Sequence, residues 1–214
     1  DTWMRRQAVD ILKMMGTPGP NDIYLNALVG LISDVSVPVK LRSAAAGALN
    51  HIDLIGLTQS NISKILFALG NLLVDGCTEQ IEVFNQGRVP PEEYLMAVIV
   101  SIQSALGTPT AKPPPVAPDA EKGEPAAAPV NSTAGGLRSV AKKANIQLIA
   151  ELTKITSEVQ STLQKKAALK LPELNRVISK TDRFLDKVEQ AMKSAGAGTA
   201  ARAPKRVAEE TTDS

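Results

Sequence analysis

The sequence predicts an all-α protein, in which a short stack of helix pairs is followed by a linker and a second helical segment. Apolar residues recur at spacings of three and four along most of the chain, which is the period of an α-helix. Aromatic residues make up only 3% of the 214 residues, so the core is aliphatic and lacks the aromatic enrichment of strands. A helical pattern also recurs at an offset of about 37 residues, near the length of helix-pair repeats.

The first predicted helix covers residues 1–15 and ends at the Gly-Thr-Pro-Gly-Pro cluster of 16–20, which cannot continue a helix. Solenoids normally end in a capping repeat with a polar outer face. This helix forms no such cap, because it carries the large apolar residues Trp3, Met4, Ile11, Leu12 and Met15. We therefore expect further residues to precede Asp1.

A helical hairpin is predicted for residues 25–52. Asn21 and Asp22 are expected to cap its first helix. The turn between the two helices is predicted from Asp34 to Pro38, since proline fits the first turn of a helix but not its interior. Apolar stripes on both helices predict that they pack together. The stripes consist of Leu25, Leu28, Val29 and Ile32 in the first helix and Leu41, Ala45, Ala48, Leu49 and Ile52 in the second.

Two more helices are predicted before residue 107. The first is capped by Thr58 or Ser60. Its glycines are poor helix formers, and they favour a break near Gly76. The second follows a Pro-Pro-Glu-Glu start, which suits a helix N-terminus, and ends at Gly107. This second helix is apolar nearly all round, so we expect it to be buried on more than one side.

The composition changes abruptly after this core. Residues 108–136 are rich in Pro, Ala and Gly and are predicted to be a disordered linker. Helical periodicity returns in 137–195, with Pro172 between two helices that are expected to form a hairpin or short coiled coil, or to bind another protein. The tail, 196–214, is predicted to be disordered. The repeat domain accordingly comprises residues 1–107.

A repeated motif carries a family resemblance. The pattern Arg-x-x-Ala-x-x-x-Leu occurs at residues 5–12 and again at 42–49. With the flanking helices it resembles a HEAT repeat of the bacterial, phycobilisome-lyase-like kind, over about the first half of the chain. The resemblance implies an α-solenoid in which an Asp after the first helix and an Arg in the second connect successive repeats. Here that structural ladder would pair Asp34 with Arg42 or Arg5, and the opening helix would be the second helix of a preceding repeat.

No residue pattern predicts chemistry or a cofactor. Cys77 is the single cysteine and His51 the single histidine, which excludes a cysteine cluster as a metal site. We expect both to be packed or surface residues rather than a nucleophile, a general base or a metal ligand. We expect Glu92 and Glu93 to favour a helix start through the helix dipole. No apolar run is long enough to span a membrane, and nothing indicates a compartment.

Charge differs between the two halves of the chain. Residues 137–193 contain twelve Lys or Arg against six Asp or Glu, whereas 1–109 contain seven against ten. A basic helical segment could follow a nucleic-acid backbone. However, the cations alternate with acids and Phe184 is the only aromatic residue there, so a solvated helix face is the preferred interpretation. Self-association through 137–195 is a further alternative.

The predicted function is that of a non-catalytic scaffold that binds another protein, since repeat solenoids offer extended surfaces. Under the family geometry, the partner-binding positions are Arg6, Asp10, Lys13 and Asn50. The alternatives are a nucleic-acid-binding protein that uses the basic C-terminal helices, and an accessory subunit of a lyase-like HEAT enzyme. The latter would need a ligand pocket on the repeat helices.

Overall fold

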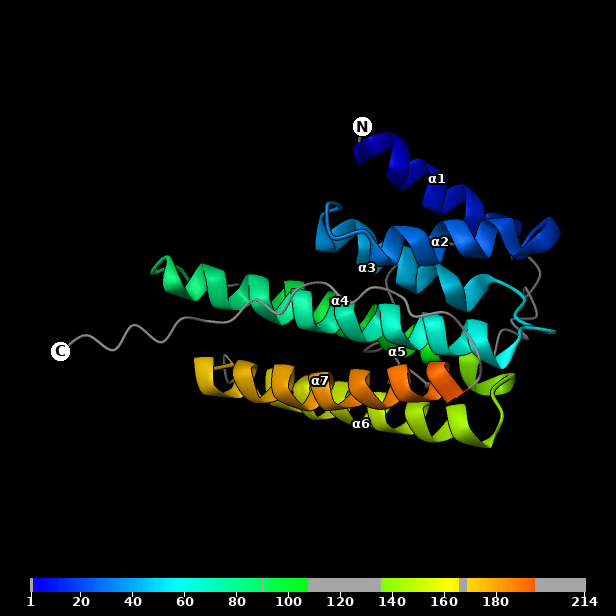
Figure 1. Ribbon diagram of the computed structural model, residues 1–214. Coiled ribbons are helices and arrows are strands. Elements are labelled where there is room, and N and C mark those ends of the chain that lie inside the picture. Colours follow the sequence, from blue (N-terminus) through cyan, green and yellow to red (C-terminus); the bar gives the residue numbers. More distant parts are fainter. Residues whose placement is uncertain (1, 90, 108–135, 166–168, 195–214) are drawn as a thin grey trace, which may run out of the picture.

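The computed structural model describes residues 2–89, 91–107, 136–165 and 169–194 (Figure 1). These residues form seven α-helices and three short 3-10 helices and contain no β-strand, so the predicted all-α class is confirmed. The predicted disordered linker, apart from Gly136, and the predicted tail lie outside the described residues.

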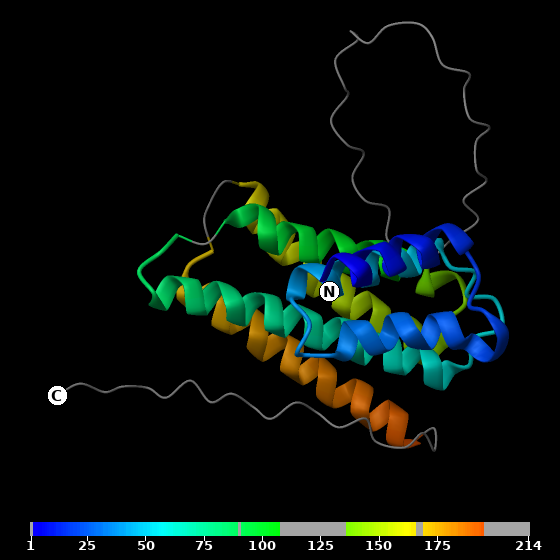
Figure 2. The same ribbon diagram turned by 90° about the horizontal axis from the view of Figure 1, so that it is seen from above.

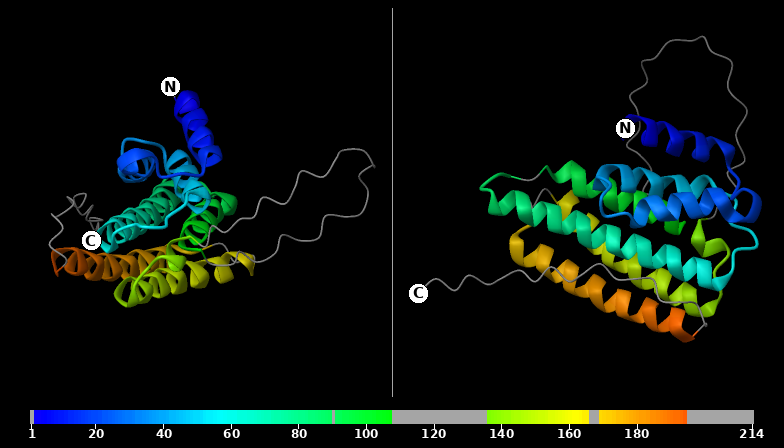
Figure 3. Two further views of the ribbon diagram at one scale, coloured as in Figure 1. Left: turned by 90° about the vertical axis from the view of Figure 1, so that its right-hand side faces the viewer. Right: turned by 45° about the horizontal axis from the view of Figure 1, so that its top comes forward.

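The helices are stacked in two layers (Figures 2 and 3). One layer consists of α2, α4 and α7, in which α4 contacts both of the others. The other layer consists of α1, α3, α5 and α6, each packed against the next. Contacts between the layers join α2 to α3, α4 to α5, and α6 to α7. The bounds are α1 (Thr2–Met15), α2 (Ile23–Ser33), α3 (Val39–Ala48), α4 (Gln59–Asn85), α5 (Glu92–Leu106), α6 (Lys143–Gln164) and α7 (Leu171–Ser194).

The predicted hairpin is formed by α2 and α3. Asp34 follows the last residue of α2, and Pro38 directly precedes α3, as expected for a proline restart. The predicted cap before α2 is wrong. Asn21 and Asp22 lie in the short 3-10 helix η1 (Pro20–Asp22), have left-handed backbone angles, and give α2 no side-chain cap. The 3-10 helix η2 (Leu49–His51) continues the chain after α3.

Helix α4 is the central element of its layer, and its 27 residues run without the predicted break at Gly76. The Thr58 hydroxyl caps it by accepting a hydrogen bond from the backbone N–H of Asn61 at 3.1 Å. The glycines have a packing role instead. A Cβ at Gly70 would lie 2.7 Å from Cδ2 of Leu185 in α7, and one at Gly76 would lie 3.5 Å from side chains of α5. Small residues there let neighbouring helices approach α4 closely.

Helix α5 is packed against α3, α4 and α6, as its apolar surface predicts. It ends at Gly107, whose left-handed conformation provides the C-cap. The described chain resumes beside this point, because a Cβ at Gly136 would lie only 2.4 Å from the Gly107 nitrogen. The short 3-10 helix η3 (Leu137–Ser139) then leads to α6. Helix α6 therefore continues the layer of α5, and α7 returns beside α4.

The C-terminal helices belong to the same core as the rest. The expected hairpin contact between α6 and α7 is present, but α7 packs far more extensively on α4. Buried apolar side chains from α1 to α7 form one continuous cluster. The seam through which we expected 137–195 to self-associate or bind another protein is therefore covered within the chain. It consists of Leu148, Leu152, Ile155, Val159 and Leu163.

Candidate protein-binding face

Helix α1 lies at one end of the stack and has neighbours on one side only (Figure 3). Its other side carries five exposed large apolar side chains, which we call the open face. Their exposed fractions are 71% for Trp3, 63% for Met4, 52% for Ile11, 79% for Met14 and 45% for Met15. A contiguous exposed apolar patch of this kind is typical of an interaction surface.

The amphipathic pattern of α1 explains why this face points outward. Val9 is buried against the stack, with 2% of its surface exposed. The residues Met4, Gln7, Ile11 and Met14 follow one another at spacings of three, four and three. This spacing aligns them in one stripe on the far side of the helix. The open face is therefore a helical seam without a second helix beside it among the described residues.

Three of the four predicted partner-binding residues border the open face. Arg6, Asp10 and Lys13 lie along one flank of α1, and Nε of Arg6 lies 3.4 Å from Oδ2 of Asp10. Both side chains of this pair are about half exposed, so the pair adds little to stability. The fourth residue, Asn50, is half-buried in η2, which α1 contacts. The flank combines both signs of charge beside an apolar seam.

The predicted ladder contact has a different partner. Arg42 is 1% exposed, and its Nη1 binds Oδ2 of Asp75 in α4 at 2.7 Å, while its Nε donates to the Ile32 carbonyl at 2.6 Å. The exposed carboxylate of Asp34 instead accepts hydrogen bonds from the hydroxyl and backbone N–H of Ser36, which lower the pKa of Asp34. Arg5 is exposed and influences Asp34 only through its charge. Among the described residues Asp34 therefore forms no ion pair with Arg42 or Arg5, because the Arg42 guanidinium pairs with the partly exposed Asp75 and Asp34 bonds to Ser36 within its own turn.

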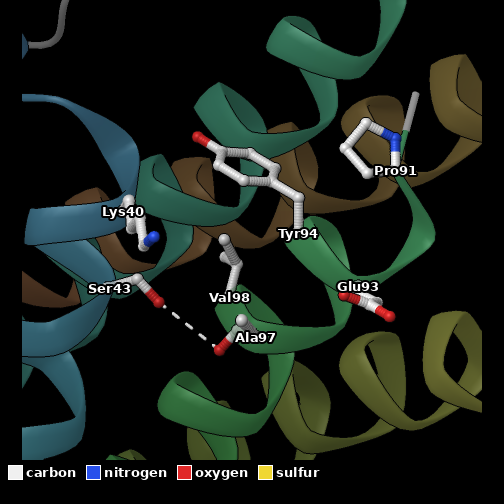
Figure 4. Close-up of a pocket in the computed structure, with 7 residues that line it drawn as sticks. All are labelled: Lys40, Ser43, Pro91, Glu93, Tyr94, Ala97 and Val98. Atoms are coloured by element: carbon white, nitrogen blue, oxygen red, sulfur yellow. Dashed lines mark hydrogen bonds between the residues drawn. The ribbon is translucent and has the colours of Figure 1, made fainter.

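A small pocket lies between α3 and α5 (Figure 4). Its volume of about 340 Å³ is at the lower end of the range for small-molecule sites. Its hydroxyl groups are already engaged, because Ser43 donates to the Ala97 carbonyl and Tyr94 donates to Glu79 of α4. Burial, aided by Glu79, raises the pKa of the Tyr94 phenol, so it stays protonated at neutral pH. Lys40 provides a cation in the lining.

The basic C-terminal helices use several cations within the fold. Lys187 binds the Glu151 carboxylate at 2.7 Å, and Lys180 binds Glu158, so two ion pairs join α7 to α6. Just before α6, the backbone N–H of Lys142 also donates to the Gln59 side chain of α4 at 2.8 Å. The remaining exposed cations are scattered among acids, as the sequence indicates. This pattern matches a solvated face better than a track for phosphates.

Burial shifts the pKa values of both the single cysteine and the single histidine. Burial raises the pKa of the Cys77 thiol to about 12, which makes it a poor nucleophile. Burial and the nearby charge of Lys13 lower the pKa of His51. Within the described ranges, no group of three or more potential ligands could hold a metal ion. None of the helices that the structure describes is long and apolar enough to cross a membrane.

Sequence reasoning identified the charged flank but not the open face itself. We expected the first helix to lack a polar cap, yet did not assign Gln7 and Met14 to a seam. The signal was the three-four-three spacing from Met4 to Met14, read against the second apolar stripe of Val9 and Leu12. Only the packing shows which of the two stripes faces the core.

The comparisons with known proteins identify no relative of this chain. No family model, no curated protein and no solved structure matches it. The resemblance to HEAT repeats therefore stays a prediction.

Proposed function

We propose that this chain is a non-catalytic scaffold, built as a HEAT-like stack of helix pairs, that binds protein through the open face of α1. One observation carries the proposal: the apolar seam of α1 points away from the only core that the described residues form. Covering this tryptophan and the three methionines would remove apolar surface from water, which favours binding of a partner. Methionine side chains are flexible and polarizable, which suits a surface that adapts to a binding partner.

The stack itself supports a helical partner. In each complete pair of the described stack, a helix of one layer is covered by a helix of the other. Helix α1 belongs to the layer of α3 and has no such counterpart among the described residues. A helix laid on the seam would complete the pair, which is the helix-in-groove mode of recognition. The charges of the flank would then fix its direction.

The proposal is tested by affinity capture with the full chain as bait. Three baits are compared: the unaltered chain, Ile11→Glu on the open face, and Ile55→Glu as a matched control, since Ile55 is 81% exposed in the loop between η2 and α4 and does not belong to the open face. We expect the unaltered chain and Ile55→Glu to retain protein at both low and high salt, and Ile11→Glu to lose it. Apolar contacts resist salt, whereas phosphate contacts weaken steeply.

Two outcomes would contradict the proposal. If all three baits retained the same proteins, the open face would not be the binding surface. If nucleic acid alone were retained, and only at low salt, the basic helices α6 and α7 would be the functional element. Circular dichroism of each bait is the control for whether the single substitutions leave the fold intact.

A further inference from the structure

We infer that the open face of α1 binds a second copy of this chain, with the two α1 helices antiparallel about a twofold axis. The inference rests on the proposed function and names its partner. Four properties of the described residues support it: the charge order along the flank of α1, the spacing of the seam residues, the area of the open face, and the polarity of the opposite end of the stack.

The flank of α1 is complementary to itself when reversed. In order along the helix it carries Trp3, Arg6, Asp10 and Lys13. A twofold axis at the middle of the helix places Arg6 opposite Asp10 of the second copy, and Asp10 opposite the second Arg6. The same operation places Trp3 opposite the second Lys13, where a cation can lie over the indole ring. A parallel pairing about a twofold axis would instead place the two flanks on opposite sides of the pair, so that Arg6 and Asp10 of the two copies would not meet.

The seam is also compatible with this pairing. The same axis places Met4 level with the gap between Ile11 and Met14 of the second copy, and Gln7 level with the gap between the second Gln7 and Ile11, so that the seam residues interdigitate across the contact. Antiparallel helices with apolar residues at this spacing pack knobs into holes. The central polar Gln7 favours one register over its neighbours, as single polar residues do in coiled-coil seams.

The area available suits a reversible dimer. Side chains of this size and exposure present roughly 600 Å² per copy, so that two copies would bury on the order of 1,200 Å², at the lower end of specific interfaces. Interfaces at this lower end belong mostly to weak, transient complexes, and we expect a dissociation constant on the order of 1–100 µM.

The other end of the stack makes a head-to-tail arrangement unfavourable. On α6 and α7, Ile146 and Leu171 are the large apolar residues exposed in the described ranges, at 40% each. The rest of that surface carries charged side chains, several of them in ion pairs. A second copy seated there would cover the open face with polar groups. Pairing α1 with α1 covers apolar surface on both copies and closes the assembly at two.

The decisive experiment exploits the reciprocal charges. Variant Arg6→Asp makes the flank acidic, and variant Asp10→Arg makes it basic, so each should dimerise at least about tenfold more weakly than the unaltered chain. Mixed in equal amounts, the two variants should form a heterodimer, because each then meets the opposite charge. Masses are measured by analytical ultracentrifugation from about 1 to 200 µM, a range that spans the expected dissociation constant. The monomer mass is 22.6 kDa.

Matched controls separate this inference from the proposed function. Ile11→Glu should remain monomeric throughout, and Ile55→Glu should dimerise like the unaltered chain. An unaltered chain that stays monomeric at every concentration, or variants that do not respond to mixing, would overturn the inference. The proposed function would survive that result if Ile11→Glu still abolished capture of another protein, and would fail with it if Ile11→Glu changed neither measurement.

Discussion

Met14 and Met192 occupy similar places at the two ends of the stack, in the last turns of α1 and α7. Met14 is 79% exposed and Met192 is 1% exposed. Both helices are amphipathic, but α7 lays its apolar face on α4, whereas α1 turns its wider apolar face outward. An apolar stripe thus predicts a helix, and only the neighbouring helices decide whether the stripe becomes core or binding surface.

The largest effect is expected from a cavity at the end of the stack where α7 packs on α4, which we call the closed end. Phe184 is 0% exposed and lies where α7 meets Gly70 of α4. Phe184→Ala removes a ring from this contact and leaves a cavity, so the free energy of unfolding should fall by about 3–5 kcal/mol. Urea denaturation measures it, with Phe184→Leu as a milder variant. The matched change at the open end, Trp3→Ala, should alter the monomer by less than about 0.5 kcal/mol. Equal losses would remove the contrast between the two ends.

A smaller loss is expected from the polar contact that joins α6 to α4. Asn145 is 3% exposed. Its amide donates to the backbone and side-chain carbonyls of Gln59 at 3.0 Å each, and its oxygen lies 3.1 Å from the Ser63 hydroxyl, which can donate to it. Asn145→Ala leaves buried polar groups with fewer partners and should cost about 2 kcal/mol. Asn26→Ala on the exposed side of α2 is the control. A loss confined to Asn145 would show that the buried network stabilises the closed end.

A third prediction tests how closely α7 approaches α4. A methyl group at Gly70 would lie 2.7 Å from Cδ2 of Leu185. Gly70→Ala should therefore destabilise by about 1–2 kcal/mol, because the overpacking outweighs the gain of about 1 kcal/mol in helix propensity. At Gly30 of α2 a Cβ would meet nothing within 4 Å, so Gly30→Ala should stabilise by up to about 1 kcal/mol. If both substitutions changed the stability in the same direction, Gly70 would not be a packing residue. Thermal unfolding of both variants decides.

The sequence was sufficient for the helices and most of their ends. Apolar spacing located each α-helix that the structure describes, because burying one face of a helix requires a period near 3.6 residues. Thr58, Pro38 and Gly107 marked ends correctly, since each acts through local backbone chemistry. Asn21 and Asp22 failed as caps because η1 gives them left-handed backbone angles that residue type alone does not predict.

Long-range packing was beyond the sequence. The partner of Arg42 is Asp75, 33 residues away, and nothing in the local pattern distinguishes Asp75 from the other acids. The place of α7 on α4 depends on Gly70, which the sequence presents only as a weak helix former. Likewise, the charged flank of α1 was visible as residues, but the outward direction of its seam follows from the contact of Val9 with the stack.

The smallest effect, and the sharpest test of the comparison, concerns Met14. At protein concentrations below those at which copies associate, Met14→Ala should change the free energy of unfolding by less than about 0.5 kcal/mol, because the side chain is already in water. The same substitution at Met192 should cost about 2–5 kcal/mol. At higher concentrations the unaltered chain should gain apparent stability, since a dimer binds only the folded state, and Met14→Ala should lose that gain while Met192→Ala keeps it. A loss above about 1 kcal/mol for dilute Met14→Ala would mean that the open face packs against this chain after all.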